Sequence, residues 1–178
     1  MKREKHEIYE WFHFAGEMLC VLLFLYIVKS LFFSWAVIDG DSMMPSIQNR
    51  DIVIVVKTMQ TYKRGDIVIC HSGKGYERNL IKRVIGVPGD VIEIDTINHR
   101  VLVNQVVLDE PYLLEETWEY GDVHYPVKVP PGQYFVMGDN RNNSLDSRYS
   151  EIGTLPSKNI EGKVKIRVYP FSRIFWFG

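Results

Sequence analysis

Two short segments carry the residue types needed for nucleophilic catalysis by a serine and a lysine. One is 39–46, Asp-Gly-Asp-Ser-Met-Met-Pro-Ser, which contains Ser42, and the other is 81–90, which contains Lys82. The five histidines of the chain are scattered, and none stands in an evident pairing with an aspartate, so a conventional serine triad has no obvious base. A serine hydroxyl would need a different base here, and a neutral lysine amine can take that role.

Lys82 can act as a base only if its amine gives up the extra proton. An exposed lysine has a pKa of about 10.4, so only about one molecule in a few thousand is neutral at pH 7. Burial disfavours the ammonium form and can lower the pKa far enough for the free amine to become abundant. Strand alternation places Lys82 on one face with Leu80 and Val84, so an apolar environment is available to it.

Each of these residues also has an unreactive interpretation. Ser42, beside Gly, Asp and Pro, can be a turn serine, and Lys82 can be a solvated lysine on an edge strand. A third segment, 138–148, is rich in turn formers, and taken alone it is an exposed loop in which Asp146 and Arg148 form an incidental ion pair. Polar loops held by a β scaffold are nevertheless where catalytic support is usually built. Considered singly, the segments favour the unreactive interpretation.

The elements that must position these segments are short β-strands. Beyond Val37, runs rich in β-branched residues alternate with turn residues, which predicts about seven strands and a mainly β domain of sandwich or barrel type. The predicted strands are 51–57, 66–70, 80–86, 90–95, 100–107, 133–137 and 163–169. Asn98 and His99 are expected to form the turn between two of them.

The N-terminal part of the chain predicts a single-pass anchor in the cell membrane. Basic residues in the first five positions precede a run at 18–38 that is apolar apart from Lys29 and a few small polar residues. As a helix, this run would be about 30 Å long, the thickness of the hydrocarbon core. The positive-inside rule then puts the N-terminus in the cytoplasm. We expect 1–36 to form the cytoplasmic N-terminus and anchor, and 37–178 to form an extracytoplasmic catalytic domain.

Two other interpretations of the N-terminus remain open beside the anchor, which we favour. Lys29 weakens the anchor, because a cation at the centre of a spanning helix costs about 2.5 to 3.5 kcal/mol. A cleaved signal peptide would have its apolar core at 18–28 and Ser34-Trp35-Ala36 as a small-X-small cleavage site. A buried helix of a soluble protein is the third possibility, but apolar residues all round the helix argue against it.

Composition narrows the function classes further. The 178 residues suffice for one compact domain, and a net charge of -1 gives no electrostatic reason to expect a nucleic-acid partner. Cys20 and Cys70 are not spaced like a metal site, and we expect both to be buried free thiols. A serine and lysine pair needs neither a metal nor an organic cofactor, so none is implied.

Taken together, the three segments resemble the type I signal peptidases, the bacterial leader-peptide proteases that use a serine and lysine dyad. The stretch 40–46 resembles the nucleophile box of this family, 81–90 its lysine box and 138–148 its third box. A further likeness at 63–68 extends the resemblance over nearly the whole chain from Met18. The fold that the resemblance implies is a signal-peptidase-like, mainly antiparallel β domain that rests on the outer membrane surface.

The resemblance also implies roles for individual residues. Ser42 would be the nucleophile and Lys82 the general base, while Ser144 would hydrogen-bond and orient the lysine amine. Asp146 and Arg148 would hold the third box against the site. The positions that would shape shallow pockets for small substrate side chains are Ile38, Ile47 and Ile81. The implied substrates are preproteins whose leader ends in Ala-X-Ala.

The chain departs from the family pattern at two places. Some members carry a serine two residues before the nucleophile, where its hydroxyl supplies an oxyanion donor, but this chain has Gly40 there. The Ser42 backbone N–H is then the expected main donor. The stretch 149–153, Tyr-Ser-Glu-Ile-Gly, also differs from the aromatic-glycine sequence that is common after the third box.

Two other functions stay open from the sequence. A self-cleaving regulatory protease would use the same serine and lysine chemistry, but the apolar span and the absence of a DNA-binding domain disfavour it. A β-rich binding module, secreted or anchored, would carry Ser42 and Lys82 as unreactive residues. Labelling by an inhibitor that acylates the active site separates this module from both enzymes.

Overall fold

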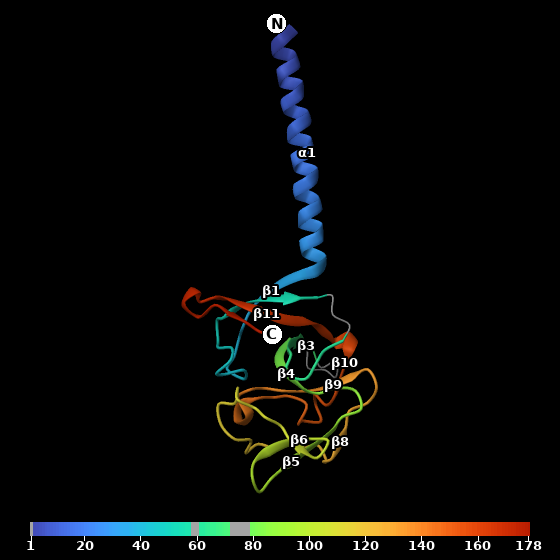
Figure 1. The fold of residues 1–178 in the computed structure, drawn as a ribbon, viewed down its shortest axis with the longest axis vertical. Helices are drawn as coiled ribbons and strands as arrows, with labels where there is room; N and C mark the ends of the chain where they lie inside the picture. The colour runs from blue at the N-terminus through green and yellow to red at the C-terminus, as the bar shows by residue number, and fades with distance from the viewer. Residues whose placement is uncertain (1, 58–60, 72–78) are drawn as a thin grey trace.

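The structure is a computed structural model that describes residues 2–57, 61–71 and 79–178. The chain begins with helix α1, Lys2–Phe32, which projects from a β domain built of two sheets (Figure 1). A mainly antiparallel β domain preceded by one apolar helix confirms the predicted fold class.

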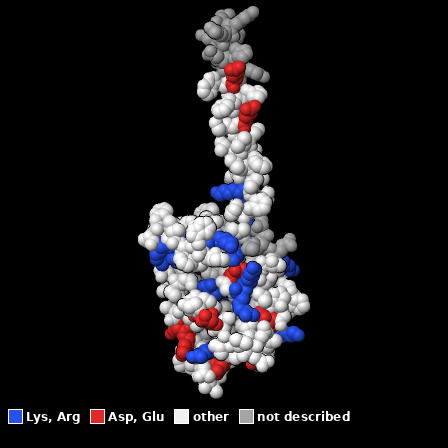
Figure 2. All heavy atoms as spheres, viewed as in Figure 1, with Lys and Arg blue, Asp and Glu red and all other residues white. Residues whose placement is uncertain are grey.

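Helix α1 has the length and the surface of a membrane-spanning helix. Its segment His13–Phe32 is 20 residues long, and none of its most apolar window is buried within the protein. A helix of that length is about 30 Å long, which matches the hydrocarbon core. Charged side chains gather over the β domain, whereas much of the helix surface is uncharged (Figure 2). Cys20 is exposed on this helix and Cys70 is buried, so the expectation of a buried thiol is wrong for Cys20.

The helix ends before the apolar run does. Phe33–Val37 form strand β1, which pairs antiparallel with β2, Ile52–Val56. The helix predicted over 18–38 is therefore too long at its C-terminal end, because the last residues of the run give their backbone hydrogen bonds to β2. As a result, Ser34 is the second residue of β1 and lies two residues beyond the end of the helix.

The larger sheet brings the predicted catalytic segments together. Its strand order is β1-β2-β11-β3-β4-β9-β10, and β12 pairs with β11. The remaining strands are β3 Ile67–Cys70, β4 Leu80–Gly86, β9 Gln133–Met137, β10 Leu155–Pro156, β11 Ile160–Tyr169 and β12 Phe175–Trp176. Within β4, Lys82 lies opposite Val68 of β3, and Val84 lies opposite Val136 of β9. Strand β4 is thus an interior strand of this sheet.

The smaller sheet has the order β7-β6-β5-β8. Its strands are β5 Val91–Asp95, β6 Arg100–Val103, β7 Val106–Val107 and β8 Val127–Lys128. Asn98 and His99 lie in the turn between β5 and β6, as predicted. The strand predicted over 100–107 is instead a hairpin, because Asn104 and Gln105 both have positive φ and turn the chain back.

Irregular segments complete the domain and pack against the site. Among the described residues, the short 3-10 helices are η1 Arg141–Asn143, η2 Ser157–Asn159 and η3 Phe171–Arg173. Residues 108–126, which we call the strap, join β7 to β8 through turns and irregular backbone. Met43 and Ile47 pack into a buried cluster with Ile67 and Ile69 of β3, which anchors the segment around Ser42 on the sheet.

Candidate active site

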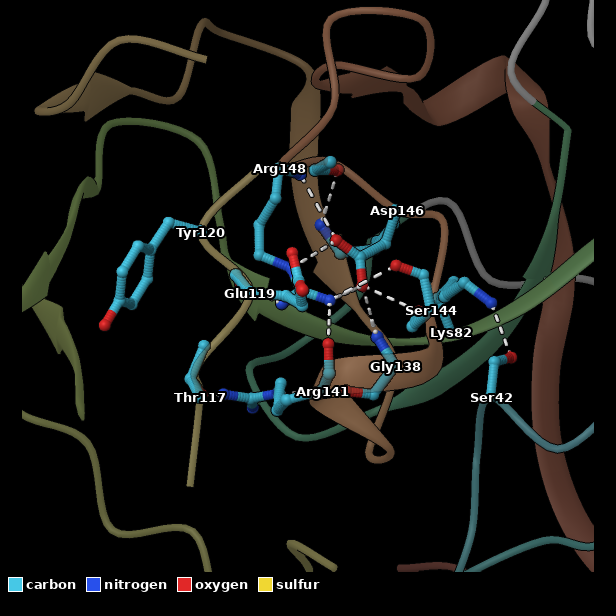
Figure 3. Close-up of polar contacts among 12 residues, drawn as sticks. Ser42, Lys82, Thr117, Glu119, Tyr120, Gly138, Arg141, Ser144, Asp146 and Arg148 are labelled. Atoms are coloured by element: carbon cyan, nitrogen blue, oxygen red, sulfur yellow. Dashed lines mark hydrogen bonds and ion pairs between the residues drawn. The ribbon is translucent and has the colours of Figure 1, made fainter. Parts of the chain in front are cut away.

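Ser42 and Lys82 meet although they are far apart in the sequence. The Nζ of Lys82 lies 2.7 Å from the Oγ of Ser42, within hydrogen-bond distance (Figure 3). Ser42 follows β1 in a turn whose base is closed by backbone hydrogen bonds between Ile38 and Asp51 and between Arg50 and Ile38. The unreactive interpretation expects Ser42 to be a turn serine whose hydroxyl bonds the local backbone. In the structure, this hydroxyl contacts the amine of Lys82.

Lys82 is buried in the centre of the sheet. Only 2% of its surface is exposed, and its strand has neighbours on both sides, so the interpretation as a solvated edge lysine is wrong. Its neighbours in the core include Leu80, Val84 and Cys70. Burial raises the pKa of the Cys70 thiol to about 12, so this neighbour is neutral at physiological pH. The apolar environment expected from strand alternation is present.

The environment of Lys82 favours the free amine. Burial is the largest influence and lowers the pKa of Lys82 below its ordinary value, although the nearby charge of Asp146 acts in the opposite direction. Besides Ser42, the amine contacts the carbonyl oxygen of Ile81 at 2.9 Å. A neutral amine that donates one N–H to Ile81 can turn its lone pair toward Ser42. The amine can then accept a proton from the serine hydroxyl.

The third segment is a buried network and not an exposed loop. Asp146 and Arg148 are fully buried, and the Nε of Arg148 donates to Asp146 at 2.8 Å. Asp146 also accepts hydrogen bonds from the Gly138 N–H at 2.9 Å and from the Ser144 hydroxyl at 2.7 Å (Figure 3). Burial raises the pKa of the Asp146 carboxyl, but the hydrogen bonds and charge of Arg148 outweigh burial and leave the pKa below its ordinary value. The carboxylate is therefore ionised and paired.

Ser144 differs from the role that the resemblance implies. Its hydroxyl donates to Asp146, and no hydrogen bond joins Ser144 to Lys82 within the described residues. A paired carboxylate is a stronger acceptor than an amine that is already engaged with Ser42 and Ile81, which accounts for this choice.

Gly138 and Asn140 connect the third segment to the backbone around Ser42. The Asn140 N–H donates to the Ser42 carbonyl at 3.0 Å, and the Asn140 side-chain amide donates to the Asp41 carbonyl at 3.2 Å. A Cβ at Gly138 would lie 2.5 Å from the Ser42 carbonyl oxygen and 2.3 Å from the Ser144 hydroxyl, so only glycine permits this approach. The sequence alone does not indicate a role for either residue, since turn-forming residues give no sign of a partner so distant along the chain.

A second ion pair braces the same region. Arg83 binds the carboxylate of Asp139 through two nitrogens, at 2.7 and 2.5 Å, and donates to the Ser46 hydroxyl at 3.1 Å. The guanidinium also lies 3.9 Å from the ring centre of Tyr112 in the strap. The nucleophile segment, the lysine strand and the third segment are therefore linked through one side chain.

The strap is fastened to the third segment by another buried pair. Arg141 is fully buried, forms an ion pair with Glu110 and donates to the Thr117 hydroxyl at 3.1 Å. Its Nε donates to the Gly138 carbonyl at 2.9 Å, next to the site. Thr117, Glu119 and Tyr120 of the strap lie on the opposite side of Asp146 and Arg148 from Ser42 (Figure 3).

A groove of about 380 Å³ opens beside Ser42 and Lys82. Its walls are β1 with the residues that follow it and the start of β4, and its lining residues are 34–39, Ser42, Ile69, 79–82 and Glu161. Two of the three expected pocket residues, Ile38 and Ile81, line this groove. The third, Ile47, is fully buried in the cluster that contains Ile38 and Ile69, so it lies beneath the groove wall and not on it.

Gly40 adopts a backbone conformation with φ of 111°, and its N–H lies 3.3 Å from the side-chain oxygen of Asn49. Within the described residues, the Ser42 N–H has no acceptor in the protein. That N–H is free to donate to a substrate oxygen.

Comparison with known proteins gives consistent matches over most of the chain. A family model described as "Signal peptidase, peptidase S26" matches residues 9–169. "Signal peptidase I S" of Bacillus subtilis (strain 168) is 37% identical over 182 residues, which cover 96% of this chain and 94% of that protein. "Signal peptidase I P" of Bacillus subtilis subsp. natto is 36% identical over 183 residues, with 97% and 95% covered.

Among solved structures, a signal peptidase I from Enterococcus faecalis V583 is 31% identical. The match covers 60% of this chain and 98% of the solved chain, with a TM-score of 0.49.

Proposed function

Because the chain belongs to the signal peptidase, peptidase S26 family, we propose that its catalysis uses Ser42 as nucleophile and Lys82 as general base. The protein is a membrane-bound serine endopeptidase that removes signal peptides. The observation that carries the residue assignment is the 2.7 Å separation between Ser42 Oγ and the buried Nζ of Lys82.

The proposed reaction has two stages. Neutral Lys82 takes the hydroxyl proton of Ser42 as the serine oxygen bonds to the carbonyl carbon of the scissile peptide. Lys82 then returns this proton to the nitrogen of the leaving chain, the carbon–nitrogen bond breaks, and the signal peptide remains as an ester on Ser42. In the second stage, Lys82 accepts a proton from water as the water oxygen bonds to the ester carbon. The bond from that carbon to the Ser42 oxygen then breaks, Lys82 returns the proton to Ser42, and the signal peptide leaves with a free carboxyl group.

The Ser42 N–H is the proposed donor to the oxyanion that forms in both stages. Its support is that, within the described residues, this N–H has no acceptor in the protein. Gly40 contributes no side-chain hydroxyl here, and its own N–H faces Asn49. A single preorganised donor of this kind contributes about 2.7 to 4 kcal/mol in enzymes that depend on one.

The substrates proposed are preproteins with small residues before the scissile bond. The groove lies between β1 and the start of β4, so an extended peptide can lie between them as an added strand. Ile38 and Ile81 line the groove together with Ser42, so their branched apolar side chains would flank the substrate residues held there. This arrangement supports a preference for small-X-small sequences such as Ala-X-Ala.

The proposed topology has the N-terminus in the cytoplasm and 37–178 outside the cell membrane. Basic residues before the apolar segment support this orientation by the positive-inside rule. Ser42 and Lys82 would then lie on the outer side of the cell membrane, where exported preproteins arrive.

The test is cleavage of a preprotein with an Ala-X-Ala site by the purified full chain in detergent. Ser42→Ala removes the nucleophile and Lys82→Arg keeps a permanent cation where a neutral amine is needed. We expect each to lower the rate by about 10⁴-fold or more. The matched controls are Ser172→Ala, at an exposed serine of η3, and Lys128→Arg, in β8 of the other sheet.

Both controls should cleave at the wild-type rate. A Ser42→Ala or Lys82→Arg enzyme that stays within about ten-fold of wild type would defeat the assignment.

A further inference from the structure

The groove beside Ser42 has a second end next to the membrane helix. Its lining includes Ser34, the second residue of β1, which follows α1 directly, as well as Ile38 and Ser42 at the opposite end. Four strand positions separate Ser34 from Ile38, which corresponds to about 13 Å at the usual rise of an extended strand. A peptide that lies along β1 can therefore extend from Ser42 to the helix end of the groove. Its upstream residues would lie at that end when the apolar part of the signal peptide stays in the membrane beside α1.

An acidic side chain stands at this far end. Glu161 belongs to β11, at a register shift between Ile160 and Gly162, and it lines the groove together with Ser34. Its carboxylate accepts a hydrogen bond from the Ser34 hydroxyl at 3.2 Å and lies 4.0 Å from the amine of Lys57.

The Glu161 carboxylate remains available to a ligand. Its side chain is 35% exposed, and its contact with Lys57 is at the outer limit for an ion pair. The ionisable residues among the described groove lining are Asp39, Lys82 and Glu161. With Lys82 neutral, both charges that face the groove are negative. The groove therefore favours a cationic substrate side chain, and at the helix end Glu161 is the residue that would select it.

We propose that Glu161 is a specificity-determining residue that favours Lys or Arg in the substrate about five positions before the scissile bond. This inference rests on the proposed function, since the position is counted from a small residue held beside Ile38. A substrate residue there lies between the cleavage site and the apolar part of the signal peptide, where a long cationic side chain can reach the Glu161 carboxylate.

The test uses peptides with one Ala-X-Ala site and Lys, Gln or Glu placed about four, five or six positions upstream of the bond. The full chain in detergent cleaves them at low salt. We expect the wild type to cleave the best-placed Lys peptide about two- to five-fold more efficiently than its Gln counterpart, as for a partly exposed ion pair. The gain should appear in KM with kcat unchanged, because the contact is made equally in the ground state and the transition state.

Variants separate a charge effect from a structural one. Glu161→Gln keeps the size and should abolish the preference for Lys, while Glu161→Lys should reverse it in favour of the Glu peptide. Lys57→Gln removes the competing cation and should enlarge the preference. Glu93→Gln, in β5 of the other sheet, is the matched control and should behave as wild type. High salt should reduce the preference, since it screens exposed charges.

The outcomes separate this inference from the proposed function. If wild type, Glu161→Gln and Glu161→Lys all cleave the peptides and show the same charge preference, Glu161 does not select the substrate. The peptidase assignment would still stand. Failure of the wild type to cleave any of these peptides would overturn both.

Discussion

Lys82 occupies an interior strand, where its ammonium form lacks the water that solvates an ordinary lysine. The pKa of Lys82 is lowered chiefly by this burial. At pH values between the lowered pKa of the folded chain and the ordinary pKa of about 10.4, Lys82 carries a proton in the unfolded chain and none in the folded chain. Stability therefore rises with pH across this window, and the cost of keeping the amine neutral disappears only above it.

Replacing Lys82 by methionine should remove this cost. We expect Lys82→Met to be inactive but more stable than wild type at pH 7, with a difference that shrinks as the pH approaches about 10.4. The measurement is the midpoint of urea unfolding of both proteins in detergent from neutral to alkaline pH. A stability difference that does not change with pH would show that Lys82 is not neutralised by folding.

Part of the candidate site follows from residue types in the sequence, and part depends on backbone contacts. Ser42 and Lys82 stand out because a strand periodicity gives the lysine an apolar face. Asn140 and Gly138 do not stand out in the sequence. Asn140 donates its backbone N–H to the Ser42 carbonyl, and Gly138 approaches the same carbonyl because it has no Cβ, and no residue pattern indicates either contact. Ile47 has the same side chain as Ile38, yet Ile38 lines the groove and Ile47 lies beneath its wall. The packing of the domain, and not the residue type, determines which of the two faces the groove.

At the scale of elements, the strap and the third segment depend on each other. Glu110 and Arg141 form a buried pair whose side chains are 6% and 0% exposed. A buried pair contributes little net stability, but removal of one partner leaves an uncompensated charge. The ion pair between Glu110 and Arg141 therefore holds the strap in place, and loss of either partner alone should destabilise the protein.

Glu110→Gln should destabilise the protein by about 3 to 5 kcal/mol, because Arg141 then lacks its counter-charge in the interior. Glu116→Gln, at an exposed position of the same strap, should change stability by no more than about 0.5 kcal/mol. Urea unfolding of the two variants gives the comparison. Equal stability of both would mean that the charge of Glu110 is not needed to hold the strap.

The longer strands could be predicted from the sequence and the shorter ones could not. Runs such as 80–86 and 133–137 are long enough and rich enough in β-branched or aromatic residues to indicate a strand, and they form β4 and β9. Strands β8, β10 and β12 have two residues each, too few for any periodicity. Strand β1 continues the apolar run of α1, so its pairing with β2 is visible only in three dimensions.

For the whole molecule, the position of α1 orients the groove. Strand β1 starts where α1 ends, so in the proposed topology the end of the groove that holds Ser34 lies nearer to the membrane than the end that holds Ser42. A signal peptide whose apolar part stays in the bilayer can reach Ser42 from that side.

The proposed topology predicts which part of the chain an external protease can reach. In bacterial spheroplasts that express the chain with an N-terminal tag, added protease should remove the 37–178 domain and leave a tagged fragment protected by the membrane. Inside-out vesicles should give the reverse pattern. Loss of the N-terminal tag in intact spheroplasts would contradict the orientation.

The measurement that bears most directly on the central assignment is the pKa of the Lys82 amine in the full chain. It can be followed by NMR titration of isotopically labelled lysine side chains in micelles, with Lys82→Arg used to identify the signal. The burial of Lys82 beside Ser42 predicts a pKa well below the ordinary value of about 10.4. An amine that titrates at the ordinary value would leave Ser42 without a base and contradict the mechanism.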